Sequence, residues 1–242
     1  MSSFDGKNVV VTGGSSGIGF ATAKLLVDGG ARVLITGRDQ AKLDSARERL
    51  GENAVAVRCD VASLSDLDLL AQRSGEEFGV LHALFVNAGV SRFVPFESMS
   101  ERVYDELLTI NAKGAFFTVQ KLAPLLAEGS GVVLTTSVVN VIGLPLLGAY
   151  AASKAALRSM ARSMARELLP RNIRVNAVSP GPIDTGITEI PREGAGQIKP
   201  EMIPLSRFGD PGEVAKAVAF LAFDATYTTG AELPVDGGGS QL

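Results

Sequence analysis

The sequence predicts an α/β protein with one doubly wound parallel sheet of about seven strands and helices on both faces. Short apolar runs alternate with helical patterns along the whole chain of 242 residues. These runs are continuously apolar, which is typical of strands that helices cover on both faces. The 27 glycines form no repeat and gather where apolar runs end. No linker interrupts this order, so we expect a single domain over residues 1–242.

The elements follow from these patterns in chain order. The expected strands are Asn8–Thr12, Arg32–Thr36, Ala54–Arg58, Ala83–Val86, Val132–Thr135, Arg174–Val178 and Glu232–Val235. The expected helices are Ile18–Val27, Ala41–Leu50, Leu64–Phe78, Glu101–Leu126, Tyr150–Leu169 and Glu213–Phe223. Ser63 followed by Asp66 forms a capping-box pattern at the start of the third helix. The segment Asp184–Pro211 has several prolines and no periodicity, so we expect a substrate lid at the carboxyl ends of the strands.

Composition and charge exclude several classes of protein. The formal net charge is 23 − 26 = −3 and no basic block occurs, which argues against nucleic-acid binding. One cysteine, Cys59, and one histidine, His82, exclude a zinc finger, argue against a Ser-His-Asp hydrolase and predict no metal site. No apolar run approaches about 18 residues, so no membrane helix is expected. No secretory signal is visible and a lone thiol forms no internal disulfide, so we expect a cytoplasmic protein.

A glycine-rich turn follows the first strand, in the sequence TGGSSGIG from Thr12 to Gly19. Gly13 permits a tight turn, Gly17 permits close approach of a ligand, and Gly19 permits close contact between helix and strand. The helix that follows directs free N–H groups and its positive dipole end toward a diphosphate. The alternative is an ordinary tight turn between strand and helix. The spacing GxxxGxG differs from the usual GxGxxG, and its place directly after the first strand favours dinucleotide binding.

The end of the second strand favours NADP(H) over NAD(H). An acidic residue about 20 positions after the glycine loop binds the ribose 2′-hydroxyl of NAD, whereas an arginine accommodates the 2′-phosphate of NADP. Gly37 and Arg38 occupy this place, and a guanidinium binds phosphate with two charge-assisted hydrogen bonds. Asp39 comes next and has two interpretations. It either repels the phosphate or caps the following helix.

Tyr150 and Lys154 form a pair at helical spacing, so their side chains share one face. Lowering a tyrosine pKa by two to three units takes roughly 3–4 kcal/mol. One ammonium about 4 Å away supplies about 4 kcal/mol at an effective dielectric of about 20. Lys154 is therefore sufficient to prepare Tyr150 as an acid and base near neutral pH. Ser137 follows the fifth strand. Asn111 lies within a helical pattern, where asparagine has low helix propensity and can distort the helix by hydrogen bonding to the backbone.

As a set, these motifs resemble the short-chain dehydrogenase/reductase family over nearly the whole chain. The matching segments are Thr12–Gly19, Asp60-Val61, Asn87–Gly89, Asn111, Ser137, YAASK at Tyr150–Lys154, SPGPIDT at Ser179–Thr185 and PVDGGG at Pro234–Gly239. The resemblance implies a Rossmann-type domain, a nicotinamide cofactor, chemistry on carbonyls and alcohols, and a homotetramer. Cys59 and His82 match no functional position of the family, so we expect them to be structural.

The resemblance also implies a role for each matching residue. Tyr150 is the acid and base, Lys154 binds the nicotinamide ribose and lowers the tyrosine pKa, Ser137 polarises the substrate oxygen, and Asn111 holds a water that relays protons to Lys154. The implied cofactor residues are Gly13, Ser15, Ser16, Gly17, Ile18, Gly19, Gly37, Arg38, Asp60, Val61, Asn87, Ala88, Gly89, Tyr150, Lys154, Pro180, Gly181, Ile183 and Thr185.

The substrate side is nearly all apolar, which favours a hydrophobic ketone or secondary alcohol. In this family the loop after Ser137 borders the substrate, and here it includes Val139 and Leu144, with Phe93 and Phe96 nearby. A 3-oxoacyl-carrier-protein reductase is the alternative, and its acidic partner requires basic residues at the cleft. No lysine or arginine occurs from Leu122 to Ser153, although Arg102 and Arg171 are candidate docking residues elsewhere in the chain. Sugar dehydrogenation and a non-catalytic nicotinamide-binding protein also stay open.

Overall fold

The computed structural model describes residues 4–186 and 198–242, and its centre is one parallel sheet. In these residues the sheet has seven strands in the order β3-β2-β1-β4-β5-β6-β7, all paired in parallel. The order reverses direction between β1 and β4, which makes the sheet doubly wound, as the sequence predicts. The strands are β1 (Asn8–Thr12), β2 (Arg32–Gly37), β3 (Ala54–Arg58), β4 (Leu81–Val86), β5 (Leu126–Thr135), β6 (Arg174–Pro180) and β7 (Glu232–Val235).

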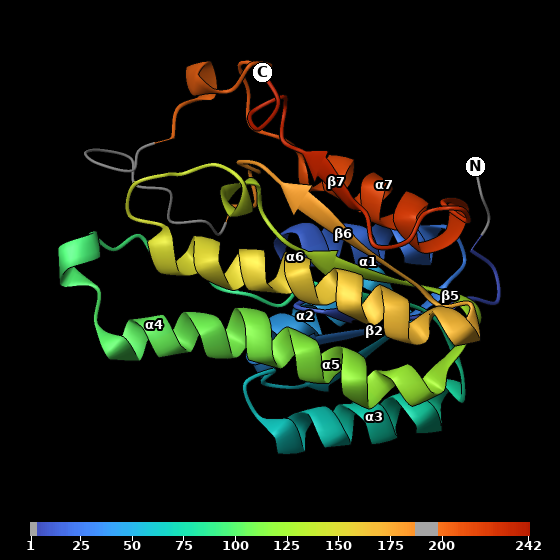
Figure 1. Ribbon diagram of the computed structural model, residues 1–242. Helices are drawn as coiled ribbons and strands as arrows, with labels where there is room; N and C mark the ends of the chain where they lie inside the picture. The colour runs from blue at the N-terminus through green and yellow to red at the C-terminus, as the bar shows by residue number, and fades with distance from the viewer. Residues whose placement is uncertain (1–3, 187–197) are drawn as a thin grey trace.

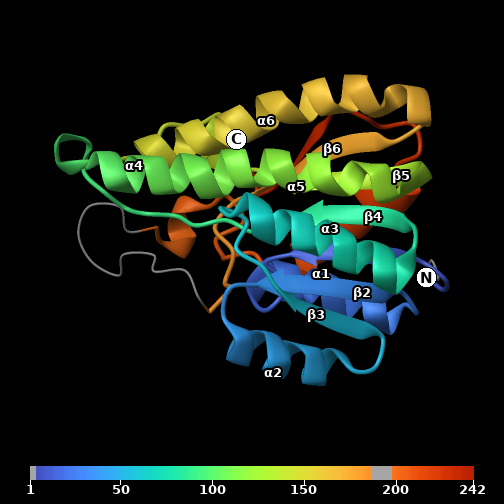
Figure 2. The same cartoon turned by 90° about the horizontal axis from the view of Figure 1, so that it is seen from below.

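Helices cover both faces of the sheet (Figures 1 and 2). α1, α2 and α7 lie on one face, and α3, α4, α5 and α6 lie on the other. Their bounds are α1 (Gly17–Asp28), α2 (Gln40–Leu50), α3 (Leu64–Phe78), α4 (Glu101–Leu108), α5 (Ala115–Leu122), α6 (Gly148–Leu168) and α7 (Pro211–Ala219). The predicted fold class is therefore confirmed.

The prediction of one continuous helix from Glu101 to Leu126 is wrong in the middle of this range and at its end. A π-helical turn, Thr109–Gly114, separates α4 from α5, and the distortion includes Asn111 as the sequence indicated. After α5 the chain forms a short 3₁₀ turn, Ala123–Leu125, because Pro124 removes a helical N–H donor. Leu126 then begins β5, which starts six residues before the expected Val132.

Local capping explains where α2, α3 and α7 begin. The Ser63 hydroxyl accepts a hydrogen bond from the Asp66 amide, and the same hydroxyl donates to the Asp66 carboxylate, which confirms the expected cap. Asp39 caps α2 by accepting from the Lys42 amide at 3.1 Å. Asp210 caps α7, which begins at Pro211 rather than at the expected Glu213.

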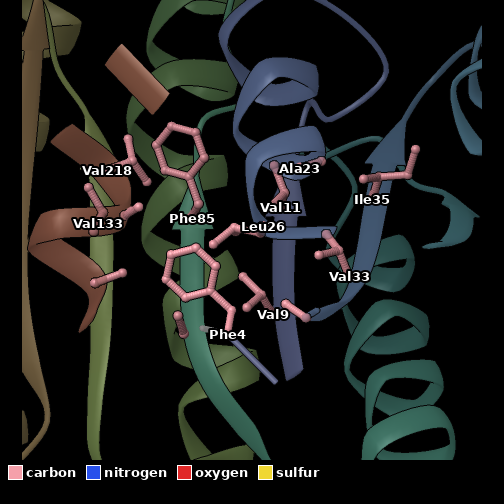
Figure 3. Close-up of a cluster of buried hydrophobic side chains, with 14 of the residues drawn as sticks. Phe4, Val9, Val11, Ala23, Leu26, Val33, Ile35, Phe85, Val133 and Val218 are labelled. Atoms are coloured by element: carbon pink, nitrogen blue, oxygen red, sulfur yellow. The ribbon is translucent and has the colours of Figure 1, made fainter. Parts of the chain in front are cut away.

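In the described residues the core has one large apolar cluster on each face of the sheet, and a small third cluster at Val138, Val139 and Leu147. Alternate residues of a strand face opposite sides, so Val9 and Val11 enter one cluster and Val10 enters the other. Figure 3 shows the first cluster, in which Leu26 of α1 and Phe85 of β4 pack against these valines. This packing fixes the strands relative to the helices, so the carboxyl ends of the strands meet at one edge.

Thr185 and Ile198, which belong to the described parts of the expected lid Asp184–Pro211, line pockets at this edge. Residues 187–197 lie outside the described residues, so the lid assignment stays a prediction. In the described part, a 3₁₀ turn covers Pro200–Met202, and Ile183 pairs with Gly209 in an isolated bridge.

Over residues 4–186 and 198–242, no helix is long and apolar enough to cross a membrane. The same residues contain no group of three or more His, Cys, Asp or Glu side chains placed to hold a metal ion.

Candidate active site

The glycine-rich turn between β1 and α1 forms the floor of the site. Gly13 adopts φ +66°, a left-handed conformation that side chains disfavour. Gly19 lies in the first turn of α1, where a Cβ would collide with the carbonyl oxygen of Gly13. Ser16 is the N-cap of α1 and its side chain forms no capping hydrogen bond. The first amides of α1 are therefore exposed to an anion at the end of the helix.

An open cleft of about 890 Å³ extends from this turn across the ends of β1, β4 and β5. Eleven of the residues expected at the cofactor line it: Gly13, Ser16, Gly17, Ile18, Arg38, Asn87, Ala88, Gly89, Tyr150, Lys154 and Thr185. Sequence reasoning missed five other residues of the lining, which are Val90, Ser91, Arg92, Val94 and Thr135. Four of them follow Gly89 within five positions. Thr135 lies two positions before Ser137, so adjacency to predicted residues was the available signal.

A smaller pocket of about 90 Å³ adjoins the cleft at the end of β2 and β3. Gly37, Arg38, Asp60 and Val61 line it, together with Cys59 and other residues. Asp60 also accepts a hydrogen bond from the Ala62 amide at 3.0 Å, so part of its carboxylate closes a turn. The residues predicted to contact adenine, Asp60 and Val61, therefore lie together with Gly37 and Arg38 at this pocket.

Arg38 and Asp39 differ in what their side chains do. Asp39 is engaged as the N-cap of α2 and does not line either pocket. Arg38 lines both the cleft and the smaller pocket. Its backbone carbonyl accepts a hydrogen bond from Nε of Arg58 at 3.2 Å, which brings a second cation near the same strand ends. Ser15 lies here too, because its hydroxyl is 3.1 Å from where a Cβ on Gly37 would be.

Asn87 joins the ends of three strands behind the cleft. Its Nδ2 donates to the carbonyls of Thr12 and Gly13 at 3.2 and 3.3 Å, and its Oδ1 accepts from the Thr135 hydroxyl at 3.3 Å. The Thr12 hydroxyl accepts from the amides of Asn87 and Ala88. Asn87 therefore shapes the cleft as well as lining it. Thr12 and Thr135 are positioning residues that the sequence reasoning did not single out.

Ser137, Tyr150 and Lys154 meet above the end of β5. Ser137 is 9% exposed and extended, with φ −168° and ψ 151°. Tyr150 lies in the first turn of α6, and its phenol accepts a hydrogen bond from the Ser137 hydroxyl. Lys154 is buried one turn later, and its ammonium donates to the Thr135 carbonyl at 2.7 Å. The structure thus brings together three of the four residues that are predicted to carry the chemistry.

The electrostatics of Tyr150 differ from the expectation. Burial raises the pKa of Tyr150 above its ordinary value, and the hydrogen bond from Ser137 opposes this rise. Burial also lowers the pKa of Lys154 to about 8. The ammonium lies 5.8 Å from the centroid of the Tyr150 ring, where it faces the ring. The Ser137 hydroxyl is therefore placed to stabilise the phenolate.

Asn111 is close to the site but does not line either pocket. Its side chain is buried, accepts from the Val90 amide at 2.8 Å, and donates to the Val90 carbonyl and the Ser153 hydroxyl. A Cβ on Gly89 would lie 3.0 Å from Oδ1 of Asn111 and 3.4 Å from Nζ of Lys154, so the two side chains approach the same point. These contacts fix the loop after β4, and the expected proton relay stays a prediction.

An apolar pocket of about 190 Å³ begins at Tyr150 and Ser137. Phe93 lines this pocket and the cleft, whereas Phe96 is 90% exposed and lines neither. The expectation that Phe96 adds to the wall is therefore wrong, because its 3₁₀ turn directs the ring into solvent. Predicted residues in the lining are Ser137, Val139, Leu144, Tyr150, Pro180, Gly181, Ile183 and Thr185.

Cys59 and His82 have structural environments. Cys59 is buried, and burial beside Asp66 and Asp60 raises the pKa of its thiol to about 12. Nδ1 of His82 accepts a hydrogen bond from the Asn8 amide at 3.0 Å, at the opposite end of the sheet from the cleft. Neither residue touches Tyr150, Lys154 or Ser137.

Comparison with known proteins identifies the family. The family model described as "Enoyl-(Acyl carrier protein) reductase" matches residues 13–240. A solved short-chain dehydrogenase/reductase from Serratia marcescens superposes with a TM-score of 0.91 at 32% identity, covering 99% of this chain and 100% of that one. The chain belongs to the short-chain dehydrogenase/reductase family and is an oxidoreductase.

Three curated relatives indicate the range of activities nearby. Oxidoreductase asL5 of Sarocladium schorii is 42% identical over 98% of this chain and 97% of its own. A 3-oxoacyl-acyl-carrier-protein reductase of Thermotoga maritima is 37% identical over 97% and 98%. A 3alpha-hydroxysteroid dehydrogenase of Mediterraneibacter gnavus is 38% identical over 96% of each chain.

Proposed function

We propose that this protein transfers a hydride between NADP(H) and a hydrophobic ketone or secondary alcohol, with Tyr150 as the acid and base. One observation carries the proposal. Tyr150 lines both the large cleft beside the glycine-rich turn and the apolar pocket that begins at Ser137. A proton donor at the junction of a dinucleotide cleft and an apolar pocket suits reduction of an apolar carbonyl. The relative named a hydroxysteroid dehydrogenase supports an apolar substrate.

The cleft fits a nicotinamide dinucleotide on the geometry of this chain. The glycine-rich turn leaves room where side chains would collide, and the first amides of α1 face that room. The residues that would hold the group are those of the turn, the pocket at Asp60 and Val61, and the segment from Pro180 to Thr185. When bound, the group supplies or accepts the hydride.

The chain's own residues manage the proton. Ser137 and Tyr150 present two hydroxyls to the apolar pocket. A carbonyl oxygen placed there accepts a hydrogen bond from both once the Ser137 proton turns from the Tyr150 phenol toward the substrate. In reduction Tyr150 gives its phenolic proton to the developing alkoxide oxygen, and in oxidation the phenolate removes it. Lys154 adds positive charge beside the phenolate, and its hydrogen bond to the Thr135 carbonyl holds it in place. The apolar walls exclude water.

The preference for NADP(H) rests on Arg38. Because Asp39 is engaged at the start of α2, its carboxylate is directed to the helix rather than to a bound phosphate. Arg38 lines the cleft and the pocket where a ribose would lie between adenine and diphosphate. Its guanidinium suits a 2′-phosphate, which two parallel N–H donors bind strongly.

Initial rates of nicotinamide oxidation test the proposal directly. Aryl and alkyl ketones are reduced in parallel with NADPH and with NADH. We expect turnover with both, with kcat/KM larger for NADPH. A preference for NADH would contradict the role of Arg38 and leave the chemistry intact. Cofactor binding without turnover on any carbonyl would support a non-catalytic nicotinamide-binding protein instead.

A 3-oxoacyl-carrier-protein reductase is the second candidate, because relatives with that name cover nearly the whole chain. The position of Arg171, one of the candidate docking charges, argues against it. The guanidinium of Arg171 is engaged by the carbonyls of Ala123 and Leu126, at the far end of α6 from Tyr150 and roughly 30 Å away along the helix. A carrier-bound substrate whose kcat/KM greatly exceeds that of free ketones and falls steeply with salt would favour this candidate.

Assembly and location complete the proposal. A homotetramer is implied by the family, and Phe116 of α5, at 38% exposed, offers apolar area for it. Met164 is buried within the chain and adds none. Light scattering at the concentrations used for kinetics tests the tetramer. We also propose the cytoplasm as location, because a lone cysteine suits a reducing compartment.

A further inference from the structure

Glu232 is a buried carboxylate that the proposed chemistry does not use. It is the first residue of β7, and its side chain is 9% exposed. It lines neither the cleft nor the apolar pocket. Carboxylates are rarely buried to this extent without paired partners, because removing a charge from water is unfavourable.

Three segments of the chain supply the partners of this carboxylate. Oε1 accepts from the Thr136 hydroxyl at 2.6 Å and from Nδ2 of Asn140 at 2.7 Å. Oε2 accepts from Nε of Arg158 at 2.6 Å. Both oxygens are therefore engaged, and the charge is compensated by a guanidinium. Glu232 follows Thr136 by 96 positions and Asn140 by 92 in the sequence, so only folding brings them together.

The first two partners lie on either side of Ser137. Thr136 directly precedes Ser137, and Asn140 ends the 3₁₀ turn Val138–Asn140 that directly follows it. In the described residues, Oδ1 of Asn140 is buried without a partner, so the hydrogen bond to Glu232 is what orients this amide. One carboxylate oxygen thus holds both ends of the short segment that carries the Ser137 hydroxyl.

The third partner lies on the helix that carries the other reacting groups. Arg158 follows Lys154 by four residues and Tyr150 by eight on α6. Residues at these spacings share one face of a helix. The hydrogen bond from Ser137 to Tyr150 spans the same two elements, the end of β5 and α6, that Glu232 joins from behind.

We propose that Glu232 is a positioning residue that holds the Ser137 hydroxyl in register with the Tyr150 phenol, through Thr136 and Asn140 on one side and Arg158 on the other. The inference rests on the proposed function, because it requires Ser137 and Tyr150 to act together on the substrate oxygen. The competing explanation is that the ion pair between Glu232 and Arg158 only stabilises the fold. Replacing Glu232 by a neutral residue distinguishes the two explanations, because only a positioning role predicts a change in kcat and in the pH–rate profile.

The variant Glu232→Gln keeps the size of the side chain and removes its charge and one acceptor oxygen. We expect kcat to fall roughly 10- to 100-fold, because small displacements of reacting groups cost this much. We expect the Kd for NADPH to stay within about twofold, since Glu232 lines neither pocket. Glu213→Gln is the matched control. It removes the charge and one of the two exposed oxygens to which Arg207 donates, and should leave kcat unchanged.

The pH profile separates positioning from stability. The Ser137 hydrogen bond lowers the pKa of Tyr150, so losing it should move the limb of the pH–rate profile for alcohol oxidation to higher pH. Glu232→Gln should show this shift and Glu213→Gln should not. An unchanged limb in folded Glu232→Gln would overturn the proposal.

A double-mutant cycle with Ser137 gives the second test, under single-turnover conditions with enzyme in excess. If Glu232 acts through Ser137, Glu232→Gln should reduce the rate less than about twofold in a Ser137→Ala background. An equal loss in both backgrounds would overturn the proposal. If Glu232→Gln does not fold, Arg158→Met repeats both tests with the carboxylate kept. Wild-type protein without turnover on any carbonyl would instead refute the proposed function.

Discussion

The two halves of the cleft are built in different ways. The half beside β1 and β2 is made largely of backbone, with the glycine-rich turn and the first amides of α1 at its floor. The half beside β5 and α6 is made of side chains, where Ser137 and Tyr150 are aligned by residues from β7 and α6. Backbone sites depend on which side chains are absent, whereas side-chain sites depend on contacts between distant segments. Substitutions in the side-chain half should therefore reduce mainly turnover, whereas substitutions in the backbone half should weaken mainly cofactor binding.

The largest effect is expected in the side-chain half. Tyr150→Phe removes only the hydroxyl, so kcat should fall roughly 10²- to 10⁴-fold while NADPH affinity stays near wild type. Steady-state kinetics and fluorescence titration of NADPH measure the two quantities. Retained turnover would refute the assigned role of Tyr150 and remove the basis of the comparison.

Arg38 tests whether a side chain also contributes to the backbone half. Arg38→Ala should weaken NADPH binding by about 1.5–3 kcal/mol, roughly 10- to 100-fold, because a charge-assisted pair to phosphate is lost. NADH binding should change little. The two Kd values, measured on the same preparation, give the ratio. Equal losses for both cofactors would show that Arg38 does not contact the 2′-phosphate.

Gly19 tests the backbone half itself. In Gly19→Ala the new methyl group collides with the Gly13 carbonyl, so we expect a loss of about 1–3 kcal/mol in unfolding free energy and weaker binding of both cofactors. Urea unfolding and cofactor titration measure these effects. Gly75→Ala is the control, because its methyl group meets Leu125 only at ordinary contact distance and favours helix α3. If Gly19→Ala behaves like Gly75→Ala, the turn is not constrained as described.

The smallest effect is expected at the opposite end of the sheet. Burial first, and then Lys7, lower the pKa of His82 below its ordinary value. The unfolded chain therefore binds the proton more readily, and stability should fall as pH decreases through about 6.5 and below. His82→Asn should flatten the dependence of Tm on pH between about 7 and 5 while kcat stays unchanged. An identical dependence in the variant would show that His82 does not contribute.

Much of the site could be predicted from the sequence because its signals are local. Gly13, Gly17 and Gly19 follow a strand at once, and Tyr150 and Lys154 are separated by one helical turn, so neighbouring residues determine their geometry. Asn111 disfavours regular helix, and the structure has a π turn there. The end of the helix at Leu122 was harder to predict, since tertiary pairing with β4 draws Leu126 into a strand despite helical periodicity.

The sequence by itself determined the fold class, the glycine-rich turn and the identity of the reacting side chains, because these depend on periodicity and short spacing. Only the tertiary structure decided that burial raises the pKa of Tyr150, that Asp39 is engaged in a helix cap, and that Glu232 joins Thr136, Asn140 and Arg158. Burial and contacts between residues as much as 96 positions apart arise from packing, which no local pattern contains.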